Sequence, residues 1–123
     1  MNKIVKLFIT SISAITLALV SFTSSFAKVD GEYIVLGSAI SLTGKYSSNG
    51  VHTQNGYNMA VDRINKMGGV EVQGKKYKFE IIYYDDESNP KRAAQGAERL
   101  IKQDGVHYML GPCSSGLTKA IAP

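Results

Sequence analysis

The sequence contains few of the residues on which disulfide frameworks and metal centres depend. Of its 123 residues, one is a cysteine (Cys113), two are histidines and none is tryptophan. A single cysteine excludes an internal disulfide, and a lone thiol beside a turn is typical of a small buried side chain. His52 and His107 stand apart without the spacing of metal ligands. We therefore expect neither a metal nor a cofactor, with His52 exposed in a loop and His107 structural.

The motifs of common enzyme classes are also missing. A nucleophile elbow requires glycine two residues before and two residues after its serine, and neither Ser114 nor Ser115 has that spacing. A P-loop requires four residues between its glycines, whereas six residues separate Gly37 from Gly44. No dinucleotide fingerprint follows the first apolar run. We predict that the chain is not an enzyme; the enzymatic alternative, an exported α/β hydrolase, would be revealed by turnover of ester substrates.

No large excess of one charge is present. The chain has 14 basic and 10 acidic side chains, and without Lys3 and Lys6 residues 28–123 retain 12 basic against the same 10 acidic ones. The basic residues are scattered and form no aromatic-basic patch, which argues against nucleic acid as a partner. Asp85 and Asp86 are adjacent, so in a strand they would face opposite sides. We expect them to act as turn residues and hydrogen-bond acceptors.

Residues 1–27 are typical of a secretory signal peptide. Lys3 and Lys6 precede an apolar run over 7–20, and Ser25-Phe26-Ala27 has the small-x-small pattern of a cleavage site. The run is too short and too rich in hydroxyls to favour a membrane anchor, and no cysteine follows it for lipid modification. We predict cleavage after Ala27 and a periplasmic location for residues 28–123.

The rest of the chain alternates between strand and helix patterns. Apolar and aromatic runs predict three strands, over 33–40, 77–84 and 106–110. Three helices are predicted between and after them. The first spans 54–67, with Tyr57 in its apolar stripe and Gly68-Gly69 at its end. The second runs from Pro90, with Asn89 as N-cap, to about Asp104, and the third runs from about Leu117 with Ser114 or Ser115 as its cap. A turn is predicted at Gln73-Gly74. This β-α-β-α-β-α order indicates an α/β fold with a parallel sheet, the start of a Rossmann-like lobe.

Three of the predicted loops contain hydroxyls, carboxylates and glycines. They are 41–44 (SLTG), 85–89 (DDESN) and 111–116 (GPCSSG). Loops that follow parallel strands open on one edge of the sheet, where ligands bind in open α/β folds. Hydroxyls and free N–H groups there suit an anionic group such as a carboxylate. Capping of helices and turns is the alternative for any single hydroxyl, but three converging loops favour a ligand site.

Four segments in order carry a family resemblance: SAISLTGKYSSNG, NGYNMAVDRINKMGG, YYDDESNPKRAAQGAERLI and GPCSSGLTKAIAP. Together they resemble the type I periplasmic substrate-binding proteins for leucine, isoleucine and valine, over essentially all of residues 28–123. The resemblance implies two α/β lobes that close around a small-molecule amino acid ligand and deliver it to the inner-membrane permease of an ABC importer. It makes residues 28–123 the first part of the N-terminal lobe, in a truncated sequence that lacks the second lobe.

The resemblance also implies ligand contacts. An alignment without gaps from Gly111 places Ser115 where the family uses a serine to hold the ligand's carboxylate. Ser114 and Thr43, whose hydroxyls lie in the converging loops, are further candidates for ligand contact. Relatives that have a disulfide in this lobe carry cysteines at positions 88 and 114, and both are serine here.

The loop ending at Asn49-Gly50 corresponds to the loop that covers the ligand. Asn49 stands where relatives often have an aromatic side chain, and Tyr46 is the candidate to supply the missing ring. This departure leaves amides, urea and aromatic acids as alternative ligands. The same lobe could also form the ectodomain of a sensory receptor, which a downstream transmembrane helix and signalling domain would reveal.

Overall fold

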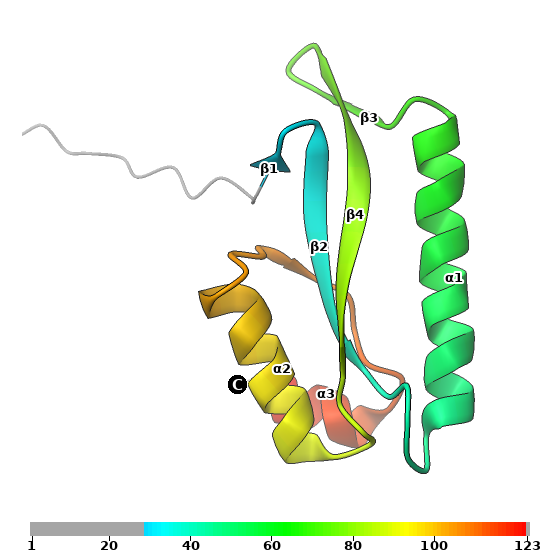
Figure 1. Ribbon diagram of the computed structural model, residues 1–123, viewed down its shortest axis with the longest axis vertical. Coiled ribbons are helices and arrows are strands. Elements are labelled where there is room, and N and C mark those ends of the chain that lie inside the picture. Colours follow the sequence, from blue (N-terminus) through cyan, green and yellow to red (C-terminus); the bar gives the residue numbers. More distant parts are fainter. Residues whose placement is uncertain (1–28, 123) are drawn as a thin grey trace, which may run out of the picture.

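The computed structural model describes residues 29–122 and arranges them as one sheet with helices on both faces (Figure 1). In chain order the elements are β1 (Val29–Asp30), β2 (Tyr33–Ile40), α1 (Ser47–Lys66), β3 (Val70–Val72), β4 (Lys75–Asp85), α2 (Pro90–Lys102), β5 (Tyr108–Met109) and α3 (Ser115–Ile121). The signal peptide and cleavage site predicted for residues 1–27 lie outside the described residues. No helix within 29–122 combines the length and apolar character needed to cross a membrane.

The three predicted strands form a parallel core. Strand β2 lies at its centre, with Tyr33–Ile40 in register with Lys78–Asp85 of β4 on one side. On the other side, Leu36 and Gly37 pair with Tyr108 and Met109 of β5. The predicted parallel arrangement is therefore confirmed.

Two short antiparallel pairings were not predicted. Strand β1 pairs with the start of β2, and β3 pairs with the start of β4. The turn predicted at Gln73-Gly74 is confirmed, and it joins β3 to β4 as a hairpin. Both residues have positive φ, 51° at Gln73 and 79° at Gly74, as a two-residue hairpin turn of type I′ requires. The sequence showed the turn, but β3 is too short to give a strand pattern.

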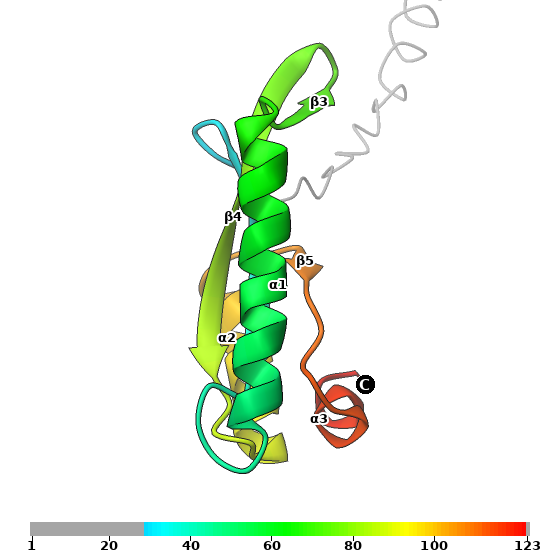
Figure 2. The same ribbon diagram turned by 90° about the vertical axis from the view of Figure 1, so that its right-hand side faces the viewer.

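Helices α1 and α2 cover opposite faces of the sheet, as the two views show (Figures 1 and 2). Helix α2 buries Ala93, Ala97 and Leu100, and Leu100 joins Val35 and Val106 in the main apolar core. Gly37 allows this close packing, because a Cβ there would lie 3.0 Å from Val106 Cγ1. The α2 side of the sheet is thus tightly closed.

The α1 side of the sheet is more open. An apolar groove of about 590 Å³ runs between α1 and the strands, and most of its walls are aliphatic or aromatic. Its lining comes from β2, α1, β3, β4, β5 and the residue after β5: Ile34, Leu36, Tyr57, Ala60, Val61, Ile64, Val70, Val72, Phe79, Tyr108 and Leu110. In consequence α1 has a half-buried apolar stripe in place of a fully buried one.

Several boundaries differ from the predictions. Helix α1 begins at Ser47, seven residues before the predicted start, and its early turns also contain His52, so the prediction of His52 in a loop was wrong. Strand β5 spans two residues in place of the predicted 106–110, because Val106 N donates to Leu100 O at the end of α2 instead of joining the ladder. Helix α3 begins at Ser115, two residues early.

Other predictions of local structure are confirmed. Helix α2 begins at Pro90, and the Asn89 side chain accepts hydrogen bonds from Lys91 N (2.9 Å) and Arg92 N (3.2 Å). Two glycines end α1 in the left-handed conformation, with φ of 96° at Gly68 and 82° at Gly69. Local capping chemistry therefore fixes these ends.

Candidate ligand-binding site

The strand order creates a topological switch point at the carboxyl edge of the sheet. The chain leaves β2 through α1 on one face towards β4, and returns through α2 on the opposite face to β5. Since β2 and β5 are neighbours, the loops after them lead to opposite sides, which is the switch point where open α/β sheets bind ligands. In Figures 1 and 2 the loops after β2 and β4 and the start of α3 all lie at the same lower end.

The loop after β2 is held by Asp85, the last residue of β4. Its Oδ1 accepts hydrogen bonds from Leu42 N (2.9 Å) and Thr43 N (3.2 Å), and its Oδ2 accepts one from the Thr43 hydroxyl (2.7 Å). Partial burial raises the pKa of Asp85, but the hydrogen bonds from Thr43, Glu87 and Leu42 outweigh this effect and leave the pKa below its ordinary value. The carboxylate is therefore charged at neutral pH.

The next residues of the same segment reinforce this hold. Asp86 is buried, at 1% exposed, and its Oδ1 accepts hydrogen bonds from the Ser41 hydroxyl (2.6 Å) and Ser88 N (2.7 Å). The Ser88 hydroxyl donates to Thr43 O (2.8 Å) and accepts from Tyr46 N (3.0 Å). The prediction that both aspartates act as hydrogen-bond acceptors is confirmed.

Asn49 and Gly50 belong to the first turns of α1, so the expectation that they end a loop was wrong. Gly50 is buried against the backbone of Ser41: a Cβ at this position would overlap Ser41 O and lie 2.6 Å from its carbonyl carbon. Asn49 is exposed. Tyr46 is half-buried at the N-cap, with Lys45 Nζ 4.6 Å from its ring centroid. Both candidate residues therefore lie at the start of α1, where Asn49 is exposed and Tyr46 is half-buried.

The loop after β5 leads into α3. Tyr57 on α1 donates a hydrogen bond to Gly111 O (3.0 Å), which ties this loop to the first helix. Ser114 is the N-cap of α3, and its hydroxyl accepts from Leu117 N at 3.3 Å. Ser115 is exposed, and its hydroxyl has no hydrogen-bond partner within residues 29–122. Of the two serines predicted as alternative caps, Ser114 is the one that caps.

An open hollow of about 490 Å³ lies over this last loop. Its lining comprises Pro112, Cys113, Ser114, Ser115, Thr118, Lys119 and Ala122. Cys113 is half-buried in it, with a free thiol. The hollow is too open to enclose a small molecule by itself.

The predicted site residues lie in two groups. Thr43 and Tyr46 lie with Asn49 near the start of α1, while Ser114 and Ser115 lie at the start of α3. The hydrogen bond from Tyr57 to Gly111 links the middle of α1 to the loop that precedes α3. Sequence reasoning placed Tyr57 in the apolar stripe of its helix and missed the hydrogen bond, because a periodic pattern does not reveal where a tyrosine hydroxyl ends.

Within residues 29–122, no group of three or more histidine, cysteine, aspartate or glutamate side chains could hold a metal ion. His107 Nδ1 lies 3.0 Å from Gly105 O, in agreement with the structural histidine predicted. The chemistry offered at the carboxyl edge of the sheet is hydrogen bonding by hydroxyls and backbone groups, with an ionised Asp85 beside the loop after β2.

Comparison with known proteins shows which family the sequence and the fold match. The family profile described as "Periplasmic binding protein" matches residues 34–123. A Leu/Ile/Val-binding protein, BraC3, from Rhizobium johnstonii is 34% identical over 93 residues, which are 76% of this chain and 24% of that protein. An amino acid binding protein from Pseudomonas aeruginosa is 34% identical over 116 residues, covering 94% of this chain and 29% of the relative.

Solved structures agree. The branched-chain amino acid transporter substrate binding protein LivJ from Streptococcus pneumoniae, crystallised with isoleucine, matches with a TM-score of 0.64 and 32% identity over 71% of this chain and 24% of that one. A possible leucine/isoleucine/valine-binding protein from Rhodopirellula baltica shares the fold, with a TM-score of 0.65 at 22% identity over 79% of this chain and 25% of that one. The chain spans about a quarter of the length of these relatives.

Proposed function

The chain belongs to the periplasmic binding protein family, and on this basis we propose that it forms part of the substrate-binding component of an ABC importer for amino acids of the leucine, isoleucine and valine class. Residues 28–123 supply the first part of the N-terminal lobe. The proposal rests chiefly on the switch point between β2 and β5, because α/β sheets hold small ligands at the loops that follow strands at such a point.

The protein acts outside the cytoplasm after its signal peptide is removed, and it binds without catalysing a reaction. The relatives named for binding leucine, isoleucine and valine support this reading, as does the isoleucine held by the Streptococcus pneumoniae protein. Its partner is the inner-membrane permease of the importer. The ligand lies between this lobe and a second lobe.

Ser115 contributes a hydrogen bond to the ligand's carboxylate, with Ser114 next to it. Ser115 is favoured because its hydroxyl is exposed and unpartnered among residues 29–122, so both its proton and its lone pairs are available. Thr43, Tyr46 and Asn49 form the opposite wall. Tyr46 supplies the aromatic surface there, although its ring already lies beneath the Lys45 ammonium.

Isothermal titration of the mature protein, which is the two-lobed protein without residues 1–27, tests the proposal. Leucine, isoleucine and valine are the expected ligands, with urea, acetamide and benzoate as competing ligand classes. Ser115→Ala removes one hydrogen bond to a charged group, worth about 1.5–3 kcal/mol, so affinity should fall by roughly 10-fold to 100-fold. Ser48→Ala is the matched control, since Ser48 is an exposed serine in the first turn of α1. Equal affinity of both variants would remove Ser115 from the site, and binding of urea or benzoate alone would replace the ligand class.

A further inference from the structure

The Asp85 carboxylate receives hydrogen bonds from three residues on two segments. Leu42 N, Thr43 N and the Thr43 hydroxyl come from the loop after β2, and Glu87 N comes from its own loop at 2.8 Å. Pairing of Ile40 with Asp85 at the ends of β2 and β4 places the carboxylate directly beside this loop. Hydrogen bonds to a carboxylate are stronger than those between neutral groups, so this is the strongest polar hold on the first loop.

These contacts also decide what the first loop can offer a ligand. A threonine hydroxyl has one proton, and Thr43 gives it to Asp85. The N–H groups of Leu42 and Thr43 are likewise directed to Asp85. These three donors are therefore used within the protein, and Thr43 Oγ1 can only accept from a ligand.

We propose that Asp85 is a positioning residue of the ligand site, which holds the loop after β2 and the start of α1 in the conformation that receives the ligand. The inference rests on the proposed function. Asp85 acts through Leu42 and Thr43, and the Ser88 hydroxyl extends the hold to Tyr46 by bridging Thr43 O and Tyr46 N. The start of α1, with Tyr46 and Asn49, is thus held in place by residues at and after the end of β4, a strand that lies outside the switch point between β2 and β5.

A loop that is merely stabilised by Asp85 would behave differently from one that is positioned for a ligand. Loss of a stabilising contact lowers the unfolding midpoint and leaves the affinity of the folded protein unchanged. Loss of positioning lowers affinity in a protein that remains folded, and the loss follows the ionisation of Asp85 as pH is varied. Affinity measured against pH separates the two.

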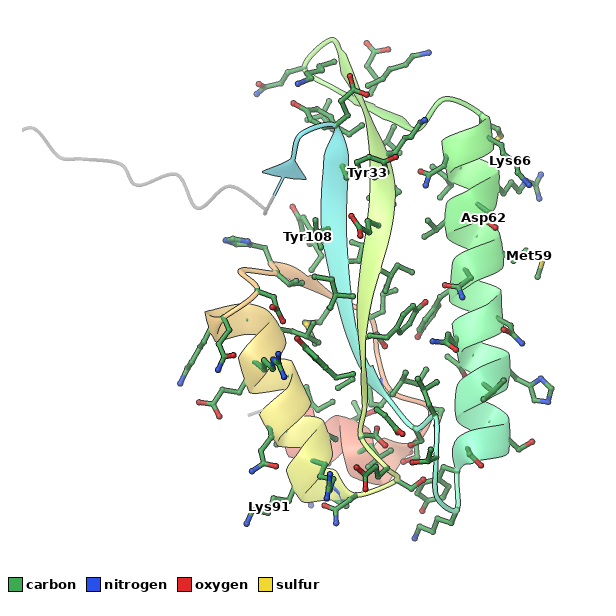
Figure 3. The ribbon with its side chains drawn as sticks, in the orientation of Figure 1. Tyr33, Met59, Asp62, Lys66, Lys91 and Tyr108 are labelled. Atoms are coloured by element: carbon green, nitrogen blue, oxygen red, sulfur yellow. The ribbon has the colours of Figure 1, made fainter. Side chains whose placement is uncertain are left out.

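The test compares Asp85→Asn with Asp62→Asn in the mature protein. Asp62 is exposed on the side of α1 that faces away from the strands, together with Met59 and Lys66 (Figure 3), so it controls for the loss of one charge. Amide hydrogen exchange is read at Leu42 and Thr43. Isoleucine affinity is read by titration calorimetry between about pH 3 and pH 7, a range that extends below the ordinary pKa of aspartate because the pKa of Asp85 is lowered.

Asp85→Asn should speed exchange at Leu42 and Thr43 and weaken isoleucine binding by about tenfold or more, as expected for the loss of charged hydrogen bonds. Asp62→Asn should change neither. Wild-type affinity should decline towards the acid end of the range, and the Asp85→Asn variant should lack that part of the decline. Unchanged affinity in Asp85→Asn overturns the inference, even if exchange becomes faster.

The proposed function fails separately, if the wild-type protein binds no amino acid; the inference then falls with it. If Asp85→Asn does not fold, Thr43→Val and Thr43→Ser replace it, since valine lacks the hydroxyl that donates to Asp85 and serine keeps it. Weak binding by Thr43→Val with recovery in Thr43→Ser supports positioning through this hydrogen bond. Equal binding by both variants contradicts it.

Discussion

Substitution of Gly50 by alanine gives the sharpest test of how the site is built. Gly50 lies in the first turns of α1, and an added Cβ would overlap Ser41 O and lie 2.6 Å from the Ser41 carbonyl carbon. Contacts below 3.0 Å are essentially absent around real Cβ atoms. Because both opposing atoms belong to the backbone, no side-chain rotation can relieve the overlap, and the start of α1 must move away from β2.

The magnitude follows from two opposing effects. Alanine favours a helix over glycine by about 1 kcal/mol, whereas overpacking costs about 1–3 kcal/mol, with a rigid backbone overlap at the upper end. We expect Gly50→Ala to lower the free energy of unfolding by about 2 kcal/mol. Gly56→Ala is the matched control in the same helix, since nothing lies within 4 Å of its added Cβ. Gly56→Ala should raise stability by about 0.5–1 kcal/mol.

Urea unfolding followed by circular dichroism measures both variants, and isoleucine titration measures the site. Gly50→Ala should also weaken binding, because Tyr46 and Asn49 move with the start of α1, while Gly56→Ala should not. If the two variants gain stability equally, α1 does not press on Ser41 and the packing described for the first loop is wrong. A loss of stability without any loss of affinity would show that the start of α1 does not touch the ligand.

Three further outcomes are expected. Leu100→Ala should lower the free energy of unfolding by about 2–5 kcal/mol because Leu100 is fully buried. Truncation of its neighbour Ile101, which is 53% exposed, should lower it by about 0.5 kcal/mol or less. Similar urea midpoints for the two variants would contradict the assigned core. Asn89→Ala should cost about 1 kcal/mol through the lost cap of α2, and the exposed Asn55 of α1 provides the control, whose truncation should change thermal stability little. Because the pKa of Asp85 is lowered in the folded protein, its charge contributes stability at pH values above the ordinary pKa of about 3.9, and this stability is lost as pH falls through the lower folded pKa. The urea midpoints of wild type and Asp85→Asn should therefore converge in that acid window. A constant difference between the midpoints would argue against the contacts described between Asp85 and the loop after β2.

The order of elements was predictable because its signals are local. The run over 33–40 is apolar enough to indicate a buried strand, and β2 has these bounds. Asn89-Pro90 predicts a helix start from capping chemistry alone, and the structure shows both hydrogen bonds of that cap. Such signals need no knowledge of the rest of the chain.

The start of α1 was not predictable in the same way. Its first turn contains Ser48, Asn49 and Gly50, which are weak helix formers, and Tyr46 gives it no side-chain cap. The turn is stabilised by contacts with distant residues, through Tyr46 N to the Ser88 hydroxyl and through Gly50 against Ser41. Packing of this kind overrides local propensity and becomes visible only when the strands are in register.

The positions of the site residues followed from the parallel sheet, but their hydrogen-bond partners did not. Ser41, Thr43, Ser114 and Ser115 all lie at the carboxyl edge, as the loop order predicts. Which of them binds within the protein depends on the register that sets Ile40 beside Asp85. A hydroxyl in a loop is chemically equally suited to capping and to ligand binding, so sequence alone left this choice open.

The hydroxyl protons of the loop after β2 and those at the start of α3 differ in whether they are already used within the protein. A carboxylate only accepts hydrogen bonds, so it requires donors. The protons of Ser41 and Thr43 are given to Asp86 and Asp85, and the charge of Asp85 beneath the first loop opposes a second carboxylate there. Ser114 accepts from Leu117 N and keeps its proton. We infer that a ligand carboxylate is received on the side of α3, and that the first loop meets the parts of the ligand that donate hydrogen bonds or carry no charge.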